Sequence, residues 1–210
     1  MSSAKEEILA RIRANGEKDS REAEYDGIAR NYRQTGTLSK DERIALLADR
    51  LHDYGCAVHR CPEAEIATCV GDVLRGRGKT HLLITPEIPA DWLPNDCELL
   101  ADSGLGYDEL DRADGVLTRC ALAIAATGTI VLRHAPDTGR RALTLVPDYH
   151  LCIVFESQMV ELVPEAMQQM RAYGRAPLTT ISGPSATSDI EMTRIQGVHG
   201  PRTLDIIFVK

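Results

Sequence analysis

The chain has 210 residues, 43% of them hydrophobic and 26% charged, which is ordinary for a globular protein able to bury a substantial core. Its net charge of −7 argues against a general nucleic-acid-binding protein, because phosphate binding requires clustered Lys and Arg. No window approaches the roughly 18 apolar residues of a membrane span, and residues 1–13 lack the apolar stretch of a signal peptide. We therefore expect a cytoplasmic protein without a membrane span.

The six cysteines are scattered, at positions 56, 61, 69, 97, 120 and 152. None of them forms a C-x-x-C motif or a zinc-finger pattern, and an iron–sulfur cluster would require several closely spaced cysteines. Three of them lie within apolar runs, where cysteine behaves as a small hydrophobic residue. We expect reduced, structural thiols, with no metal and no cofactor bound by this chain.

Residues 1–38 are expected to form a separate N-terminal region. Periodicity predicts an amphipathic helix over residues 2–13. Its apolar face consists of Ile8, Leu9 and Ile12. Residues 14–38 are polar and carry alternating charges, so we expect a linker or an extended arm before the main domain, residues 39–210.

The first half of the main domain alternates between helices and strands. Helices are predicted from Ser39 to Gly55, with a capping box of Ser39 and Glu42, and from Pro62 to Gly76. Strands are predicted at residues 56–59, 81–84 and 98–101. Because the connections are too long for hairpins, this pattern predicts a parallel sheet covered by helices.

The second half is expected to contain antiparallel strands, since its short apolar runs are separated by turns of a few residues. These runs are residues 121–125, 130–132, 143–146 and 150–155. They are followed by a predicted helix from Pro164 to Gly174, a strand at 178–182, a helix near 188–196 and a strand at 204–209. The fold class is therefore predicted to be α/β, with a mixed sheet.

A glycine turn that leads into an acidic segment is a candidate anion site. Gly183 permits backbone conformations closed to other residues, and free N–H groups are expected where the next helix begins. The hydroxyl groups of this stretch belong to Ser185, Thr187 and Ser188. A purely structural interpretation is equally open, because Ser188 and Glu191 form a capping box and Asp189 complements the helix dipole.

Three other stretches could carry chemistry. His199 lies between two glycines, and its ordinary pKa of about 6.5 suits proton transfer, although a histidine in a turn can simply be exposed. Gly128, in Thr127-Gly128-Thr129, marks either a bulge or the close approach of a ligand. The basic loop at residues 133–141 could attract an anionic substrate or form a solvated hairpin tip. No serine-hydrolase elbow, Walker A motif or G-x-G-x-x-G is present.

Four of these stretches together resemble the lactate utilization protein C family, which is built on the LUD domain. They are Ala123–Leu132, Leu143–His150, Gly183–Glu191 and Gly197–Pro201, and they occur in the family's order. The resemblance extends from about Ser39 to the C-terminus. It implies a three-layer α/β fold with a mostly parallel sheet flanked by helices, like that of the sugar-phosphate isomerase and CoA-transferase superfamily.

The resemblance also implies a function and a set of site residues. The function is an accessory role in the oxidation of L-lactate to pyruvate, alongside iron–sulfur partner proteins that would carry the clusters. The site residues carried over as ligand-binding are Thr127, Gly128, Thr129, Gly183, Ser185 and Thr187, and those carried over as catalytic are Asp189, Glu191 and His199. The family commonly has a glutamate where this chain has Ala126.

Three hypotheses about function follow, and the sequence leaves open whether the chain catalyses a reaction by itself. The first is the accessory subunit, which would bind a small anionic metabolite. The second is a stand-alone enzyme that acts on a small phosphorylated or CoA-linked acid, with His199 as general acid or base and Glu191 or Asp189 as its partner or as a nucleophile. The third is a non-catalytic module that senses a metabolite.

Overall fold

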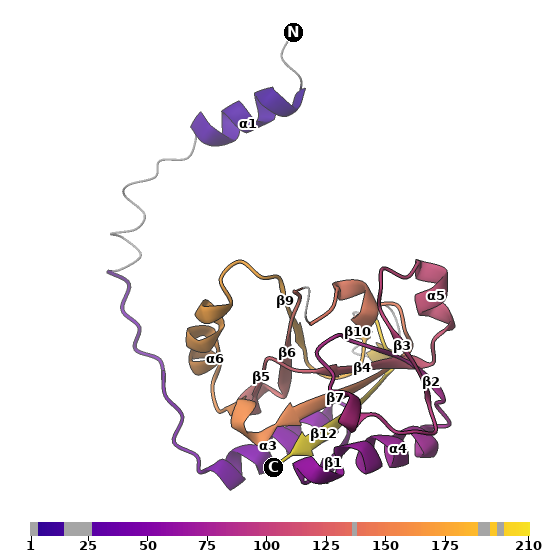
Figure 1. The fold of residues 1–210 in the computed structure, drawn as a ribbon. Coiled ribbons are helices and arrows are strands. Elements are labelled where there is room, and N and C mark those ends of the chain that lie inside the picture. The colour runs from indigo at the N-terminus through magenta and orange to yellow at the C-terminus, as the bar shows by residue number, and fades with distance from the viewer. Residues whose placement is uncertain (1–3, 15–26, 136–137, 189–193, 197–199) are drawn as a thin grey trace. The chain divides into compact units, whose positions relative to one another are not determined.

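The computed structural model describes residues 4–14, 27–135, 138–188, 194–196 and 200–210 (Figure 1). The chain divides into two units, Met1–Arg33 and Gln34–Lys210. The described part of the first unit contains helix α1 (Ala4–Ala14), in which no residue is buried. The described part of the segment predicted as a helix over residues 2–13 is therefore helical. Within the described ranges, no helix combines the length and the apolar character that crossing a membrane requires.

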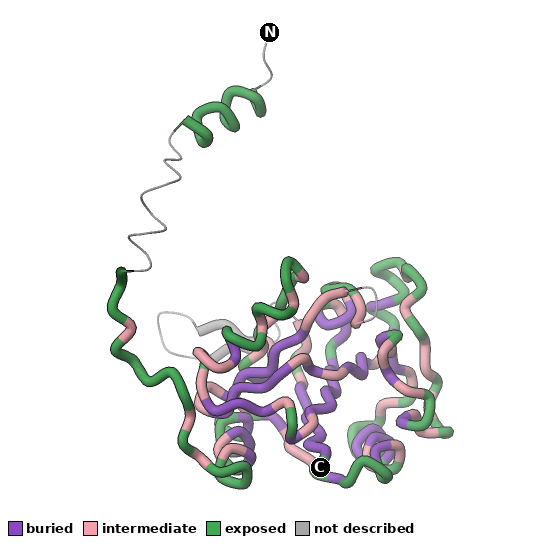
Figure 2. The backbone as a smooth tube through the Cα atoms, turned by 60° about the vertical axis from the view of Figure 1, so that its left-hand side comes forward, coloured by how far each residue is buried: buried purple, intermediate pink, exposed green. Residues whose placement is uncertain are grey.

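The second unit is built on a six-stranded sheet in which every neighbouring pair of strands is parallel. In spatial order the strands are β1 (Ala57–Cys61), β12 (Thr203–Val209), β7 (Tyr149–Phe155), β4 (Gly115–Arg119), β2 (His81–Ile84) and β3 (Glu98–Ala101). This arrangement confirms the predicted α/β class and the parallel pairing of the first half of the main domain. Buried residues follow the strands and the inner faces of the helices (Figure 2).

Helices α3 (Lys40–Asp53) and α4 (Ile66–Arg77) cover opposite faces of this sheet. Alternate residues of β7 show this: Cys152 packs in the cluster that contains α3, and Ile153 in the cluster that contains α4. The predicted capping box of α3 is present, since the Ser39 hydroxyl accepts from the Glu42 N–H and the Ser39 N–H donates to the Glu42 carboxylate. A short helix that was not predicted, α5 (Tyr107–Arg112), precedes β4.

Helix α4 differs from its prediction at both ends. Pro62 precedes a 3₁₀ turn, η1 (Glu63–Glu65), and α4 follows that turn. The helix continues through Gly76 and ends at Gly78, whose φ of +63° is left-handed. A glycine inside a helix is tolerated, whereas the left-handed position that ends one strongly favours glycine.

A second sheet of four strands lies beside the first. Its order is β8 (Met159–Val160), β5 (Leu122–Ile124), β6 (Thr129–Arg133) and β9 (Leu178–Ile181). The β5–β6 pair is antiparallel, as predicted for these two runs, and the β6–β9 pair is antiparallel as well. The prediction was wrong for β7, which pairs in parallel with β4 and β12. All residues of β7 except Phe155 are buried, as a parallel strand covered on both faces requires.

Two other predictions in the second half were wrong. Residues 143–146 were predicted as a strand, but they overlap a 3₁₀ turn, η4 (Arg141–Thr144). Leu143 and Val146 pack in the same cluster, and a spacing of three residues is the period of a helical turn. The helix predicted near residues 188–196 is replaced, in its described part, by the antiparallel strands β10 (Ala186–Ser188) and β11 (Arg194–Gln196). A capping-box pattern is local, and here the cross-strand pairing overrides it.

A buried carboxylate holds the segment that precedes α3. The N–H groups of Thr37 and Leu38 donate to Glu161 Oε2 at 2.5 and 2.7 Å, and the Glu161 residue is only 1% exposed. Gly36 donates to Glu165, and any Cβ at Gly36 would collide with the Glu161 side chain. The segment before α3 is therefore anchored on two carboxylates, one directly after β8 and one in the first turn of helix α6 (Val163–Met170).

Replacing Glu161 by Ala should destabilise the protein by about 1–3 kcal/mol, because two backbone N–H groups lose a charged acceptor. Urea unfolding at neutral pH measures this free energy. Glu63→Ala is the matched control, since Glu63 is exposed in η1, and its effect should stay within about 0.5 kcal/mol. Equal stability of the two variants would contradict the anchoring role of Glu161.

Candidate functional site

The four segments that carry the family resemblance, which we call the motif segments, meet in the fold although they are far apart in the sequence. They are residues 123–132, 143–150, 183–191 and 197–201. Thr129, at the start of β6, lies with its Oγ1 2.9 Å from the Oγ of Ser182, which directly precedes the Gly183 turn. The N–H of Ser185 in turn donates to the carbonyl of Pro201 at 2.8 Å. These two contacts join the segments 123–132, 183–191 and 197–201.

The fourth segment, residues 143–150, joins this group at both of its ends. A Cβ placed on Gly200 would lie 3.6 Å from the Ser185 Cβ and 4.0 Å from a methyl group of Leu145. At the other end, the carbonyl of Asp148 accepts from the N–H groups of Arg202 and Thr203 at 2.9 and 3.3 Å. The predicted site segments are therefore neighbours in space.

Three hydroxyl groups form a chain where β6 begins. Thr127 Oγ1 lies 2.7 Å from Thr129 Oγ1, which also contacts Ser182. Thr129 is buried, Thr127 is half-buried and Ser182 is exposed. The structure thus unites two of the predicted ligand-binding residues and adds Ser182, which only the register between β6 and β9 could have revealed.

Gly128 serves the packing of α3 against the turn before β6. Its φ is +60°, and a Cβ there would lie 2.7 Å from the Arg50 Cβ and 3.1 Å from the Tyr54 ring. Both of these partners belong to the last turn of α3 or follow it directly. The close approach at this glycine is therefore made by a helix of the same chain.

Ala126 occupies the position at which the family commonly has a glutamate. Its N–H donates to the carbonyl of Glu161 at 3.0 Å. The buried Glu161 carboxylate is already bound to the N–H groups of Thr37 and Leu38. The Glu161 carboxylate, which belongs to the residue that pairs with Ala126, therefore binds the segment that precedes α3.

The remaining predicted residues are placed as follows. Gly183 is buried, with a φ of +86°, and Ser185 is half-buried. Thr187 lies in β10 opposite Ile195. Asp189, Glu191 and His199 lie outside the described residues, so their catalytic roles stay predictions.

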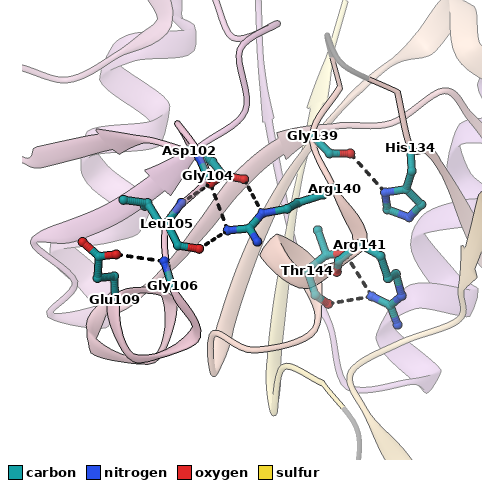
Figure 3. Close-up of polar contacts among 10 residues, drawn as sticks. All are labelled: Asp102, Gly104, Leu105, Gly106, Glu109, His134, Gly139, Arg140, Arg141 and Thr144. Carbon is teal, nitrogen blue, oxygen red and sulfur yellow. Dashed lines mark hydrogen bonds and ion pairs between the residues drawn. The ribbon is translucent and has the colours of Figure 1, made fainter.

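A cavity of about 490 Å³ opens beside the basic loop, and we call it the basic-loop pocket. Its charged and imidazole side chains are those of Asp102, His134, Arg140 and Arg141, which Figure 3 shows together with Gly104 and Gly139 of the same lining. Asp102 follows the carboxyl end of β3, and His134 follows the end of β6. Crevices at the carboxyl ends of parallel strands are common ligand sites in α/β proteins.

Arg140 and Asp102 neutralise one another in this pocket. Arg140 donates to both carboxylate oxygens of Asp102, at 2.7 and 3.0 Å, and also to the carbonyl of Leu105 (Figure 3). Burial would raise the pKa of Asp102, but the Arg140 guanidinium and the N–H groups of Gly104 and Leu105 outweigh it and lower that pKa. This pair stiffens the loop and leaves little charge for a ligand.

Arg141 supplies the charge that remains for a ligand, beside an uncharged His134 whose two ring nitrogens are both hydrogen-bonded within the protein. Arg141 donates to the carbonyl and hydroxyl oxygens of Thr144, and no carboxylate in the described ranges forms an ion pair with it. His134 Nδ1 faces the Gly139 carbonyl at 3.3 Å and its Nε2 faces the Thr179 hydroxyl at 2.8 Å. Burial lowers the pKa of His134, so the ring is neutral at pH 7, with the proton on Nδ1. The pocket therefore offers one guanidinium and one neutral imidazole.

His150, which shares the motif segments with His199, is a structural residue. Its Nε2 lies 2.8 Å from Thr118 Oγ1 inside the sheet, and the residue is 1% exposed. Burial lowers the pKa of His150 to about 3, so the ring is uncharged at neutral pH. Among the residues that the structure describes, no group of His, Cys, Asp or Glu side chains has an arrangement that could hold a metal ion.

Sequence reasoning identified the basic loop, which contains His134, but missed its partners Asp102 and Thr179. Arg140 and Arg141 stood out because they are adjacent charges in a turn. The partners of the loop come from β3 and β9, which no local pattern connects to it. Only the strand order brings these residues together.

Comparison with known proteins finds close similarity over most of the chain. Residues 44–209 match the family model described as LUD domain. The protein "Lactate utilization protein C" of Deinococcus radiodurans is 47% identical over 176 residues, which are 82% of each chain. Its namesake in Shouchella clausii is 34% identical over 105 residues, 48% of this chain and 45% of that relative. The crystal structure of a DUF162 family protein from Deinococcus radiodurans superposes with a TM-score of 0.72 at 42% identity, covering 83% of this chain and all of that one.

Replacing Asp102 by Asn should cost stability at neutral pH and progressively less in acid. A carboxyl whose pKa is lowered by folding stabilises the protein above its unfolded pKa, about 3.9, and this stabilisation is lost as the pH falls through the folded pKa. Urea unfolding between about pH 7 and pH 3 should show the two proteins converging. Asp111→Asn, at an exposed position of α5, is the control, and a pH-independent gap for Asp102→Asn would contradict the argument.

Proposed function

The chain belongs to the LUD domain family, and from that premise we propose that it acts in lactate utilization. The observation that carries this proposal is the relative named "Lactate utilization protein C", which is 47% identical over 82% of both chains. Similarity of that extent spans the whole parallel sheet and all four motif segments, rather than one shared motif.

Within lactate utilization we propose an accessory subunit for the oxidation of L-lactate to pyruvate. That oxidation releases two electrons and two protons, so it needs electron acceptors beyond the side chains of this protein. We assign the electron carriers to iron–sulfur partner proteins and assign the binding of a small anionic ligand to this chain.

The stretches singled out in the sequence offer two places that suit such a ligand. In the basic-loop pocket, Arg141 can bind a carboxylate through charge-assisted hydrogen bonds, with the neutral His134 nearby. At the start of β6, the hydroxyl groups of Thr127 and Thr129 lie next to the turn at Gly183. The Asp102–Arg140 pair would hold the loop in place in either case.

A stand-alone enzyme is the second candidate, and one contact favours it. The hydrogen bond from Ser185 to Pro201 brings the Gly183 turn beside Gly200, the residue that follows His199. We propose that His199 would then act as general acid or base, with Asp189 or Glu191 as its partner, on a small phosphorylated or CoA-linked acid.

Deleting the gene in the native organism should abolish growth on L-lactate and leave growth on pyruvate unchanged. The wild-type chain should restore growth, and an affinity-tagged copy should co-purify with iron–sulfur proteins detected by their visible absorption. Arg141→Met should restore growth poorly, whereas Arg175→Met, at an exposed position outside both sites, should restore it fully. Normal growth of the deletion strain on L-lactate would refute the proposed role.

The purified chain distinguishes the other two hypotheses. A stand-alone enzyme should turn over a phosphorylated or CoA-linked acid, and His199→Ala should abolish that turnover while the circular dichroism spectrum is retained. A sensing module should instead show a ligand-dependent rise in melting temperature without turnover. Undiminished turnover by His199→Ala would remove the catalytic role assigned to that residue.

A further inference from the structure

A second cavity lies where the strand order of the large sheet reverses, and we call it the switch-point pocket. The chain runs from β2 outward to β3, and then from β4 in the other direction through β7 to β12. The cavity, about 270 Å³, lies at the carboxyl ends of β2 and β4. Its wall includes Glu87, Arg119, Cys120, Arg133, Gln158 and Tyr173. Such reversal points are where open α/β sheets most often bind ligands.

Arg119, the last residue of β4, is held in this wall by two aromatic rings. Its guanidinium carbon lies 5.2 Å from the centre of the Trp92 ring and 5.5 Å from that of Phe155. The two rings are themselves 5.5 Å apart. Cation–π contacts of this kind are worth about 0.5–2 kcal/mol each, so they fix the position of the charge without neutralising it.

Arg119 has no hydrogen-bonding or anionic partner in the described part of the chain. Its Nε is buried and makes no hydrogen bond, a state that costs about 1–3 kcal/mol. Other arginines of this fold do have such partners, since Arg77 pairs with Asp205 at 2.6 Å and Arg140 with Asp102 at 2.7 Å. Arg43 also has a buried Nε without a partner, but it lies in the field of the Glu165 carboxylate. Arg119 is thus a guanidinium that lines a cavity and forms no ion pair within the described residues.

The other polar groups of the wall are already satisfied by the protein. Gln158 donates to the carbonyl of Cys120 at 2.7 Å and accepts from the N–H of Phe155 at 2.8 Å. The Tyr173 hydroxyl donates to the carbonyl of Ala121 at 3.3 Å. The wall therefore retains an unused hydrogen-bond donor, the Arg119 guanidinium. The group that complements it is a negatively charged hydrogen-bond acceptor.

The charge of the wall selects a monoanion. Glu87 contributes one negative charge, and Arg119 and Arg133 contribute one positive charge each. The Arg133 guanidinium lies 5.8 Å from the centre of the Tyr173 ring, at the end of β6. Arg119 is the group of this wall whose charge has no anionic partner among the described residues, and one carboxylate would balance it, whereas a phosphate dianion would bring a second negative charge toward the Glu87 carboxylate. Guanidinium groups bind carboxylates in a planar, bidentate geometry.

We infer that the switch-point pocket binds a small monocarboxylate, whose carboxylate completes the ion pair of Arg119. This site is distinct from the basic-loop pocket, because the two cavities share no lining residue: His134 and Gly139 line one, and Arg133 and Thr138 line the other. The inference rests on the geometry of Arg119 and holds without the proposed role. It deepens that role, however, since L-lactate and pyruvate are both small monocarboxylates.

The full-length chain titrated with L-lactate, pyruvate, acetate and inorganic phosphate tests this inference by calorimetry and by thermal shift. At least one monocarboxylate should bind saturably, and more tightly than phosphate. Arg119→Met should weaken that binding tenfold or more with the circular dichroism spectrum retained, and Arg119→Lys should weaken it less. Unchanged binding by Arg119→Met, or no saturable binding of any of the three monocarboxylates, would overturn the inference.

Further variants keep the result interpretable. Arg175→Met, at an exposed position that lines neither pocket, should leave monocarboxylate binding intact. Loss of binding in Arg141→Met together with full binding in Arg119→Met would assign the ligand to the basic-loop pocket and overturn the inference. Glu87→Gln makes the switch-point pocket more positive, so it should shift the preference toward phosphate even if Arg119→Met does not fold. An unchanged preference would contradict the charge argument. The two proposals can fail separately. If monocarboxylate binding requires Arg119 but the deletion strain grows normally on L-lactate, the site is supported and the proposed role is refuted.

Discussion

The all-parallel pairing of the large sheet is the constraint on which the rest of the structure depends. Parallel strands place all their carboxyl ends at one edge, and both of the pockets described above open there. Asp102 follows β3, Arg119 ends β4 and Glu87 follows β2. None of these side chains is near another in the sequence, so strand order alone makes them neighbours. The second sheet then contributes Arg133 and His134, which complete the two pockets from the other side.

Long-range pairing also explains which predictions succeeded. The capping box of Ser39 and Glu42 is a signal within four residues, and α3 begins where it predicts. The alternation of helices and strands in the first half correctly indicated a parallel sheet, because each crossover leaves a recognisable helical pattern. The parallel pairing of β7 could not be read locally, since its partners β4 and β12 lie about thirty and fifty residues away along the chain.

The candidate site was predictable as a set of segments but not as a set of contacts. The four segments that carry the family resemblance do meet, through Thr129 and Ser182, Ser185 and Pro201, and Gly200 and Leu145. The roles of single residues within them depend on neighbours that a sequence does not name. Gly128 illustrates this. The position has no room for a Cβ because α3, a helix more than seventy residues earlier in the chain, packs closely against it.

The arginines of this fold differ in whether an aspartate balances their charge, and this difference separates structural arginines from a candidate ligand-binding one. Arg77 and Arg140 each form an ion pair with a buried or nearly buried aspartate, so their charges stabilise the fold. Arg119 is held as firmly, but by aromatic rings that leave its charge uncompensated. A fold that needed Arg119 only to cover Trp92 and Phe155 could use an uncharged side chain and avoid the cost of the buried Nε. That cost becomes understandable if a ligand supplies the anionic partner of Arg119, in the cavity at the point where the strand order of the sheet reverses.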